Sequence, residues 1–370
     1  MSEAVNTDHR AAPDAASRKP PRPARARARL PAAAGSSLLG TSLLAVALLV
    51  SLWLSLGFGS VDISLGDASR SLWRSLSGES DPASRVVMQV RLPRAILAAL
   101  VGSLLALCGV IMQAFFRNAM AEPYLVGVSS GAALGAVLAM LLGWSVRIGW
   151  FSTVPLFAFL FGLATVALVY AIHARRRFSP GALLITGIAI SSAVSAVVAL
   201  LLVTSERSVQ DVLFWLLGSL STARWTHVAI VAPYAVVGLA ASIALARDLD
   251  LLLWGDITGA ALGVRIGRTR AILLAAASLM TAACVAVCGI LGFVGIMVPH
   301  LARGLTGSAH RRLIPAAMLL GGLLLVWADV LARTLRAPTE LPLGAITAIV
   351  GAPFLVYLCG SSRRQEGWLS

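Results

Sequence analysis

The sequence predicts an all-α polytopic membrane protein, and three observations support this fold class. Of 370 residues, 58% are hydrophobic and 12% are charged, and the mean hydropathy is +0.86. A soluble domain carries roughly 25% charged residues, so this chain has too few to cover a globule of its length. The apolar residues also form blocks of about 20, the length at which a helix crosses a bilayer. A soluble enzyme, a nucleic-acid-binding protein and a secreted disulfide-stabilised scaffold are thereby excluded.

The chain divides into a basic tail, a membrane domain and a short C-terminal tail. Residues 1–35 are rich in Ala, Pro and Arg and lack the hydrophobicity to fold, which predicts a disordered cytosolic tail. Residues 36–362 are predicted to form ten transmembrane helices, and residues 363–370 a cytosolic C-terminal tail. The expected helices cover residues 37–57, 95–116, 123–143, 150–174, 182–204, 226–246, 271–290, 292–306, 313–332 and 342–359. The apolar stretch 212–220 predicts a further short helix at the membrane interface.

The basic residues support this count. The formal charge of +14 would suggest a nucleic-acid partner in a soluble chain, but in a membrane protein it reflects the excess of Lys and Arg on the cytosolic side. With ten spans and a cytosolic N-terminus, 20 of the 30 Lys and Arg residues fall on cytosolic segments and 10 on outer segments. An odd number of spans would lose this bias. Both termini are therefore predicted to be cytosolic, and no nucleic-acid partner is expected.

A short repeated motif suggests two halves of opposite orientation. Residues 94–97 and 270–273 both read Arg-Ala-Ile-Leu, and they open the second and the seventh predicted span. Because five spans separate them, the two halves would cross the membrane in opposite directions. Such inverted repeats are typical of transporters.

The scarcity of lysine and the absence of certain motifs exclude several kinds of chemistry. Lys19 is the single lysine, so no Walker-A loop can form in the membrane domain, and ATP would have to bind another chain. The motif H-E-x-x-H is absent, which argues against a zinc-dependent membrane enzyme. No cofactor or metal site is expected, because His300 is interpreted as a helix-end histidine rather than a metal or haem ligand, and the cysteines lack a Cys/His cluster. The cysteines are Cys108, Cys284, Cys288 and Cys359.

Asp329 is the clearest ionisable residue deep within a predicted span, where a carboxylate is costly. Arg333 follows four residues later on the same helix face and can pair with it. A proton-coupled secondary transporter would use such an acid. A structural ion pair is the favoured interpretation.

The loop at residues 247–270, on the predicted cytosolic side, contains two short amphipathic segments with a turn at Gly255. Short helices with apolar faces outside the bilayer dock into a groove of another protein or lie on the lipid surface.

Several motifs together indicate a family. The chain resembles, over about residues 40–360, the FecCD-type permease subunits of binding-protein-dependent ABC importers for iron-siderophores, haem and vitamin B12. The resemblance rests on residues 91–94 (Arg-Leu-Pro-Arg), 117–123, 127–132, 292–295 with 298–300, 328–333, 340–344 and 351–353. Departures are small: Ala119 stands where proline is usual, Asp256 where glutamate is typical, and Gly259 where alanine is common.

The resemblance implies a multi-pass permease in the bacterial inner membrane. It implies a homodimer, two copies of a separate ABC ATPase and a periplasmic substrate-binding protein as partners. The expected cargo is an iron chelate, haem or ferric siderophore, with cobalamin as the alternative within the family. An ion-coupled secondary transporter is the weaker alternative and rests on Asp329 and the faint repeat.

The resemblance also implies two sets of contact residues. Coupling to the ATPase is expected from the cytosolic loop, at Trp254, Gly255, Asp256, Ala260, Leu262, Gly263 and Val264. Docking of acidic side chains of the binding protein is expected at Arg91, Arg94 and Arg333 on the outer face. Alternatively, Arg91 and Arg94 anchor a helix at head-group level and Arg333 neutralises Asp329.

Overall fold

The computed structural model describes residues 34–59, 63–76, 82–143, 147–148, 151–174, 179–205 and 209–361. The predicted C-terminal tail at 363–370, and residues 1–33 of the predicted N-terminal tail, lie outside these ranges.

The regular secondary structure of the described residues is helical apart from one pair of two-residue strands. Strands β1 (Arg147–Ile148) and β2 (Phe151–Ser152) pair antiparallel. The long helices are α1 (Ala34–Ser55), α4 (Leu92–Phe116), α5 (Val128–Leu141), α6 (Thr153–Ala174), α7 (Pro180–Val203), α9 (Trp225–Ala244), α12 (Ile266–Cys288), α13 (Val294–Thr306), α14 (His310–Thr334) and α15 (Leu343–Ser361). The short helices are α2 (Leu65–Leu76), α3 (Pro82–Val86), α8 (Val209–Leu216), α10 (Ala246–Leu253) and α11 (Asp256–Ala261), with helical turns η1 (Val87–Arg91) and η2 (Pro123–Val126).

Each of the ten expected spans coincides with one long helix. Within the described ranges, six helical segments are long and apolar enough to cross a membrane, and α1, α5 and α15 contain shorter apolar helices. The six are Pro82–Phe116, Thr153–His173, Pro180–Val203, Trp225–Ala244, Ile266–Cys288 and His310–Thr334. The polytopic helical fold is confirmed, while the count of ten spans and the direction of the termini stay predictions.

Two of the long helices begin inside the bundle. Helix α5 has 14 residues and α13 has 13, or about 20 Å at 1.5 Å per residue, which is less than the roughly 30 Å hydrocarbon core of a bilayer. A residue with left-handed backbone precedes each of them: Gly127 (φ 91°) before α5 and Phe293 (φ 69°) before α13. This conformation stops any helix from continuing across these points.

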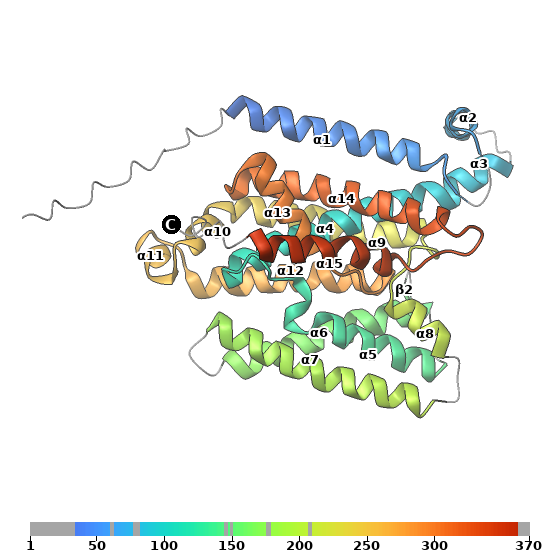
Figure 1. Cartoon of the computed structure of the whole chain (residues 1–370). Coiled ribbons are helices and arrows are strands. Elements are labelled where there is room, and N and C mark those ends of the chain that lie inside the picture. Colours follow the sequence, from blue (N-terminus) through green and yellow to red (C-terminus); the bar gives the residue numbers. More distant parts are fainter. Residues whose placement is uncertain are drawn as a thin grey trace, which may run out of the picture.

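The helices lie side by side along one direction (Figure 1). At one end of the molecule lie α10 and α11, and at the opposite end lie α2, α3 and α8. We call these the α11 end and the α8 end. Helix α4 is central: most of its residues are buried, and it packs against α9, α12, α13 and α14.

Glycines bring the central helices into close contact. A Cβ atom on Gly102 of α4 would collide with the carbonyl group of Gly321 in α14, and one on Gly109 would collide with the carbonyl of Gly295 in α13. Small residues allow such close packing where lipid provides no hydrophobic force between helices. These contacts hold α4 in register with its two neighbours.

The packing repeats between the two halves of the chain. In the series α1, α4, α5, α6, α7 and the series α9, α12, α13, α14, α15, the third helix is the short one. Helix α4 packs against α13 and α14 of the second series, and α12 packs against α5 and α6 of the first. This reciprocal pairing is the arrangement that two related halves would produce, as the repeated Arg-Ala-Ile-Leu motif suggested.

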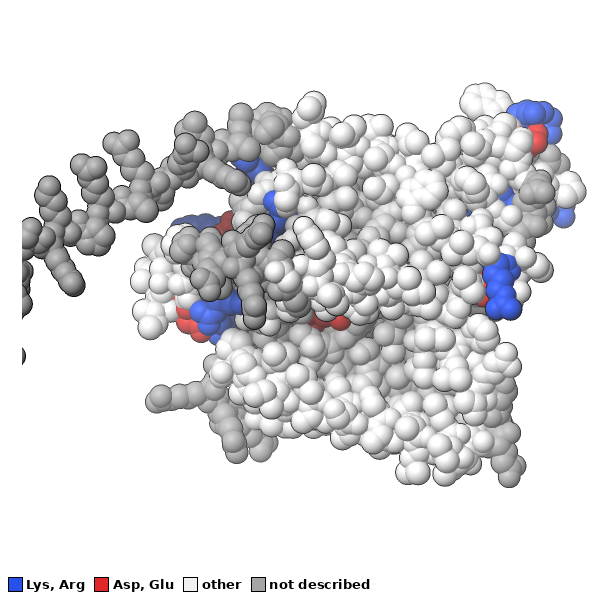
Figure 2. Space-filling model, viewed as in Figure 1, with Lys and Arg blue, Asp and Glu red and all other residues white. Residues whose placement is uncertain are grey.

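Charged side chains gather at the two ends of the visible face, as Figure 2 shows. Blue and red atoms lie over α10 and α11 at one end, and over α2 and the turn between α14 and α15 at the other. The band between them is largely uncharged, which fits a surface that contacts lipid.

Candidate functional site

The α8 end holds an ion cluster centred on Arg94, near the start of α4. Its Nε donates to both carboxylate oxygens of Asp329 in α14, at 3.0 and 3.1 Å, and Nη2 donates to Oδ1 at 2.9 Å. On its other edge, Nη1 and Nη2 donate to Oε1 and Oε2 of Glu340, at 2.7 and 3.0 Å. One guanidinium therefore binds two carboxylates, each in the bidentate geometry that suits Arg.

Arg91 and Arg333 bind backbone carbonyl groups at the end of α1. Arg91 Nη1 donates to the Leu56 carbonyl at 2.6 Å. Arg333 Nη2 and Nη1 donate to the carbonyls of Ser55 and Phe58, both at 3.0 Å. The last carbonyls of a helix have no partner within it, and basic side chains can satisfy them. These two arginines thus cap α1 from α14 and from the turn that precedes α4.

The expected pair of Asp329 and Arg333 is present but is the weaker one. Arg333 Nε lies 3.5 Å from Asp329 Oδ2, whereas Arg94 forms the close contacts. The sequence motif did not reveal Arg94 and Glu340 as partners because they come from distant parts of the chain. All three arginines are buried in this cluster, so their docking to a partner stays a prediction.

The turn that carries Glu340 is connected to α8. The Leu341 N–H donates to the Ala332 carbonyl at 2.8 Å. Next, Leu343 and Gly344 donate to the carbonyls of Gly218 and Leu217, both at 2.9 Å, in the segment just after α8. The ion cluster, the start of α15 and the end of α8 therefore form one connected unit.

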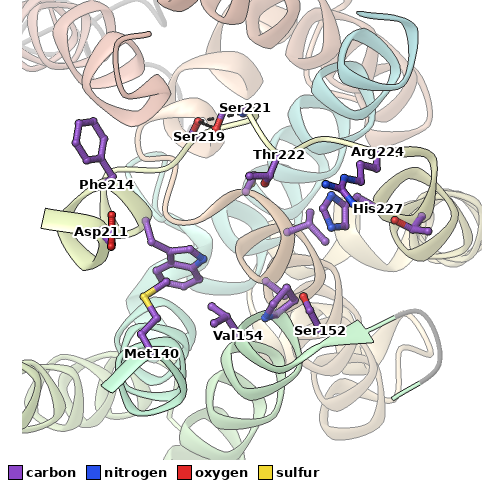
Figure 3. A pocket seen from close by; sticks show the side chains of 16 residues that line it. Met140, Ser152, Val154, Asp211, Phe214, Ser219, Ser221, Thr222, Arg224 and His227 are labelled. Atoms are coloured by element: carbon purple, nitrogen blue, oxygen red, sulfur yellow. Dashed lines mark hydrogen bonds between the residues drawn. The ribbon is translucent and has the colours of Figure 1, made fainter. Parts of the chain in front are cut away.

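A cavity of about 520 Å³ opens beside this unit. It lies among the ends of α5 and α12, strand β2, the start of α6, α8 and the start of α9. Arg224 and His227 lie together on one side and Asp211 on another, as Figure 3 shows. His227 Nδ1 is buried without a hydrogen-bond partner. No local pattern in the sequence indicates this cavity, because six elements contribute to it.

At the α11 end, three aspartates fix the loop of α10 and α11 to the bundle. Asp256 accepts two bonds from Arg270, at 2.8 and 2.7 Å, and Arg117 lies 3.5 Å away. Asp250 accepts the His310 N–H at 3.1 Å and contacts His310 Nδ1 at 2.6 Å. Asp248 accepts from Thr269 at 3.1 Å. The polar side of the loop is thus turned toward the bundle.

Apolar side chains of the same loop point away from the bundle. Ile257 is 89% exposed, Trp254 is 75% exposed and Leu262 is 53% exposed. Of the other expected contact residues, Ala260 and Gly263 are exposed, Gly255 and Asp256 are half-buried, and Val264 is buried. Ile257, the most exposed of these residues, was not among the expected contact residues. The sequence could have indicated Ile257 through its position in one of the two short amphipathic segments of the loop.

A joint between the two short helices lies inside the bundle. Glu122 Oε1 accepts the Phe293 N–H at 2.8 Å. Tyr124 donates its hydroxyl to the Leu291 carbonyl at 2.9 Å and accepts the Leu291 N–H at 3.3 Å. These bonds hold the strained backbone of Phe293 in place.

Among the described residues, no group of three or more His, Cys, Asp or Glu side chains is placed to hold a metal ion. Cys108, Cys284 and Cys288 are buried free thiols. His300 lies against the Phe354 ring, with a centroid separation of 5.8 Å.

A bundle of apolar helices with a charged cluster at one end and a projecting apolar loop at the other defines a polytopic membrane protein. The chain belongs to the FecCD transport family, whose sequence model matches residues 47–360. It is a transport permease of this family.

Three curated relatives illustrate the range of the family. The chain is 45% identical, over 76% of its length and 75% of the relative, to the cobalamin import system permease protein BtuC of Halobacterium salinarum. It is 42% identical, over 74% and 84%, to the Fe(3+) dicitrate transport system permease protein FecD of Escherichia coli. It is 35% identical, over 84% and 93%, to the hemin transport system permease protein HmuU of Yersinia pestis.

A solved structure has the same fold. It is described as an inward-facing conformation of a metal-chelate type ABC transporter. The TM-score is 0.77 at 32% identity, covering 87% of this chain and 98% of that one.

Proposed function

We propose that this protein is the permease subunit of an ATP-driven importer that moves a metal chelate from the periplasm into the cytoplasm. In this proposal two copies form a homodimer in a bacterial inner membrane. Two ABC ATPase chains bind at the α11 end and a substrate-binding protein docks at the α8 end. Both termini would then be cytosolic, and residues 1–35 and 363–370 would form cytosolic tails.

The observation that carries the proposal is the loop of α10 and α11. Its aspartates are occupied by the bundle, whereas Trp254, Ile257 and Leu262 project outward. Large apolar side chains on short helices at a charged end are poorly placed to contact lipid tails and well suited to a groove in another protein. An ATPase that binds this loop could transmit its motion through Asp256 and Asp250 into α12 and α14.

The cargo proposed is an iron chelate, either haem or a ferric siderophore such as a citrate complex. The names of the FecD and HmuU relatives support iron chelates. Cobalamin is the second candidate, because the BtuC relative shares 45% identity over 76% of this chain.

The test is uptake into proteoliposomes that contain the permease, its ATPase and its binding protein. ⁵⁵Fe-haem, ⁵⁵Fe-dicitrate and ⁵⁷Co-cobalamin would be supplied separately, with ATP or a non-hydrolysable analogue inside. ATP-dependent accumulation of an iron chelate supports the proposal. Accumulation of cobalamin alone selects the second candidate, and a complex that neither binds an ATPase nor accumulates any chelate contradicts the proposal.

A further inference from the structure

The accessible carboxylate of the ion cluster is Glu340. Its side chain is 36% exposed, whereas that of Asp329 is 1% exposed. Both carboxylates bind Arg94 in a bidentate manner, one on each edge of the guanidinium. An incoming carboxylate can therefore bind Arg94 in the same way only by displacing one of them. Glu340 is the one within reach.

We propose that Glu340 occupies, within the free permease, the position that an acidic side chain of the docking partner takes on binding, and that its displacement loosens the link between this turn and α8. The inference rests on the proposed function, in which a substrate-binding protein docks at the α8 end. It adds a residue that controls this docking and a path by which docking reaches the bundle.

The exchange is favourable on charge grounds. Arg94 binds Asp329 on one edge and Glu340 on the other, so releasing Glu340 leaves one edge of this buried guanidinium without its carboxylate. The partner's carboxylate restores the balance. A buried guanidinium without a partner is costly, so replacement of one carboxylate by another is a far easier route than opening the cluster.

The backbone around Glu340 permits the movement. Asp329 lies within α14, but Glu340 follows an exposed turn, residues 335–339, that is outside any helix. Beyond Glu340, Leu341 is bonded to Ala332, and Leu343 and Gly344 are bonded to Gly218 and Leu217. Release of the side chain therefore acts on the bonds that connect the start of α15 with the end of α8.

The experiment compares Glu340→Gln with Asp67→Asn in the permease–ATPase complex in nanodiscs. Asp67 lies at the same end, in α2, but pairs with Arg70 on the surface and has no contact with Arg94. The probe is the substrate-binding protein that the wild-type complex retains on purification. We expect Glu340→Gln to lower its Kd about ten-fold at low salt, since the internal competitor is removed, and Asp67→Asn to change it little.

Unchanged or weaker binding by Glu340→Gln, or equal tightening by Asp67→Asn, overturns the inference while leaving the proposed function intact. A wild-type complex that binds no such protein contradicts the proposed function itself. A second measurement needs no variant: amide hydrogen exchange of Leu343 and Gly344 in the wild-type complex should accelerate when the binding protein docks. Unchanged or slower exchange at both amides also overturns the inference.

Discussion

Both ends of the molecule pair a buried arginine with a partly exposed carboxylate, but they differ in what lies beside that pair. At the α8 end the three arginines of the ion cluster are buried beside the buried Asp329, and Glu340 is the accessible carboxylate of the cluster. At the α11 end Arg270 is buried, its partner Asp256 is 41% exposed, and apolar side chains project beyond it. One end can exchange one charged partner for another, whereas the other offers a fixed apolar contact. This difference suits a partner that binds and leaves at the α8 end, and one that remains attached at the α11 end.

Among the variants that compare the two ends, Arg94→Leu should cause the largest loss of stability. The change leaves Asp329 buried with only the more distant Arg333, and the expected loss of stability is about 3–5 kcal/mol. Thermal unfolding of the purified permease in detergent measures it. The double variant Arg94→Leu with Asp329→Leu should recover much of the loss, because apolar residues can replace a buried ion pair. Wild-type stability in the single variant would mean that the cluster contributes nothing.

Ile257→Glu should have the next largest effect, on coupling rather than on stability. The side chain is almost fully exposed, so the permease should fold normally, while a charge in an apolar contact should reduce stimulated ATPase activity by about ten-fold or more. The control is Leu335→Glu, with binding of the ATPase as the second readout, because Leu335 is an exposed leucine at the α8 end. If Leu335→Glu lost binding of the ATPase and Ile257→Glu did not, the two ends would have been assigned to the wrong partners.

Arg270→Leu should destabilise the permease less than Arg94→Leu, by about 1 kcal/mol. Asp256 keeps access to water and to Arg117, and the new leucine would replace the contact of Arg270 with the Phe115 ring. Thermal unfolding under the same conditions gives the comparison directly. Equal losses for the two variants would show that the two ends do not differ in burial of charge.

The smallest expected effect is that of a protonophore. Asp329 is bonded to Arg94 and almost fully buried, which favours a structural ion pair over a proton carrier. With ATP held constant inside proteoliposomes, collapse of the proton gradient should leave uptake unchanged. A loss of uptake would favour the ion-coupled secondary transporter.

The sequence predicted the helices well because each is encoded locally, by a block of apolar residues between turns. The predicted span 95–116 and the observed α4 at Leu92–Phe116 end at the same residue. The π-helical turn η1 and the helices α2 and α3 were not predicted, since they lie in a more polar stretch without a long apolar block.

The candidate sites were predicted only in part, because many of the contacting residues lie far apart in the sequence. The pairing of Asp329 with Arg333 follows from a spacing of four residues within one helix. Arg94 is separated from Asp329 by 235 residues and from Glu340 by 246, so only the packing of α4 against α14 brings them together. For the same reason, no local pattern indicated the contact between Asp250 and His310 or the cavity beside His227.

The capping of α1 has a consequence for how the chain is made. The carbonyl of Ser55 is bound by Arg333, which is synthesised 278 residues later, and α1 packs mainly against α14. Arg91 can bind the Leu56 carbonyl soon after α1 is made, but the carbonyls of Ser55 and Phe58 lack their partner until nearly the whole chain has been synthesised. In a ribosome-bound fragment that stops before α14, α1 should crosslink to the insertion machinery. In a fragment that includes α14, this crosslink should be lost.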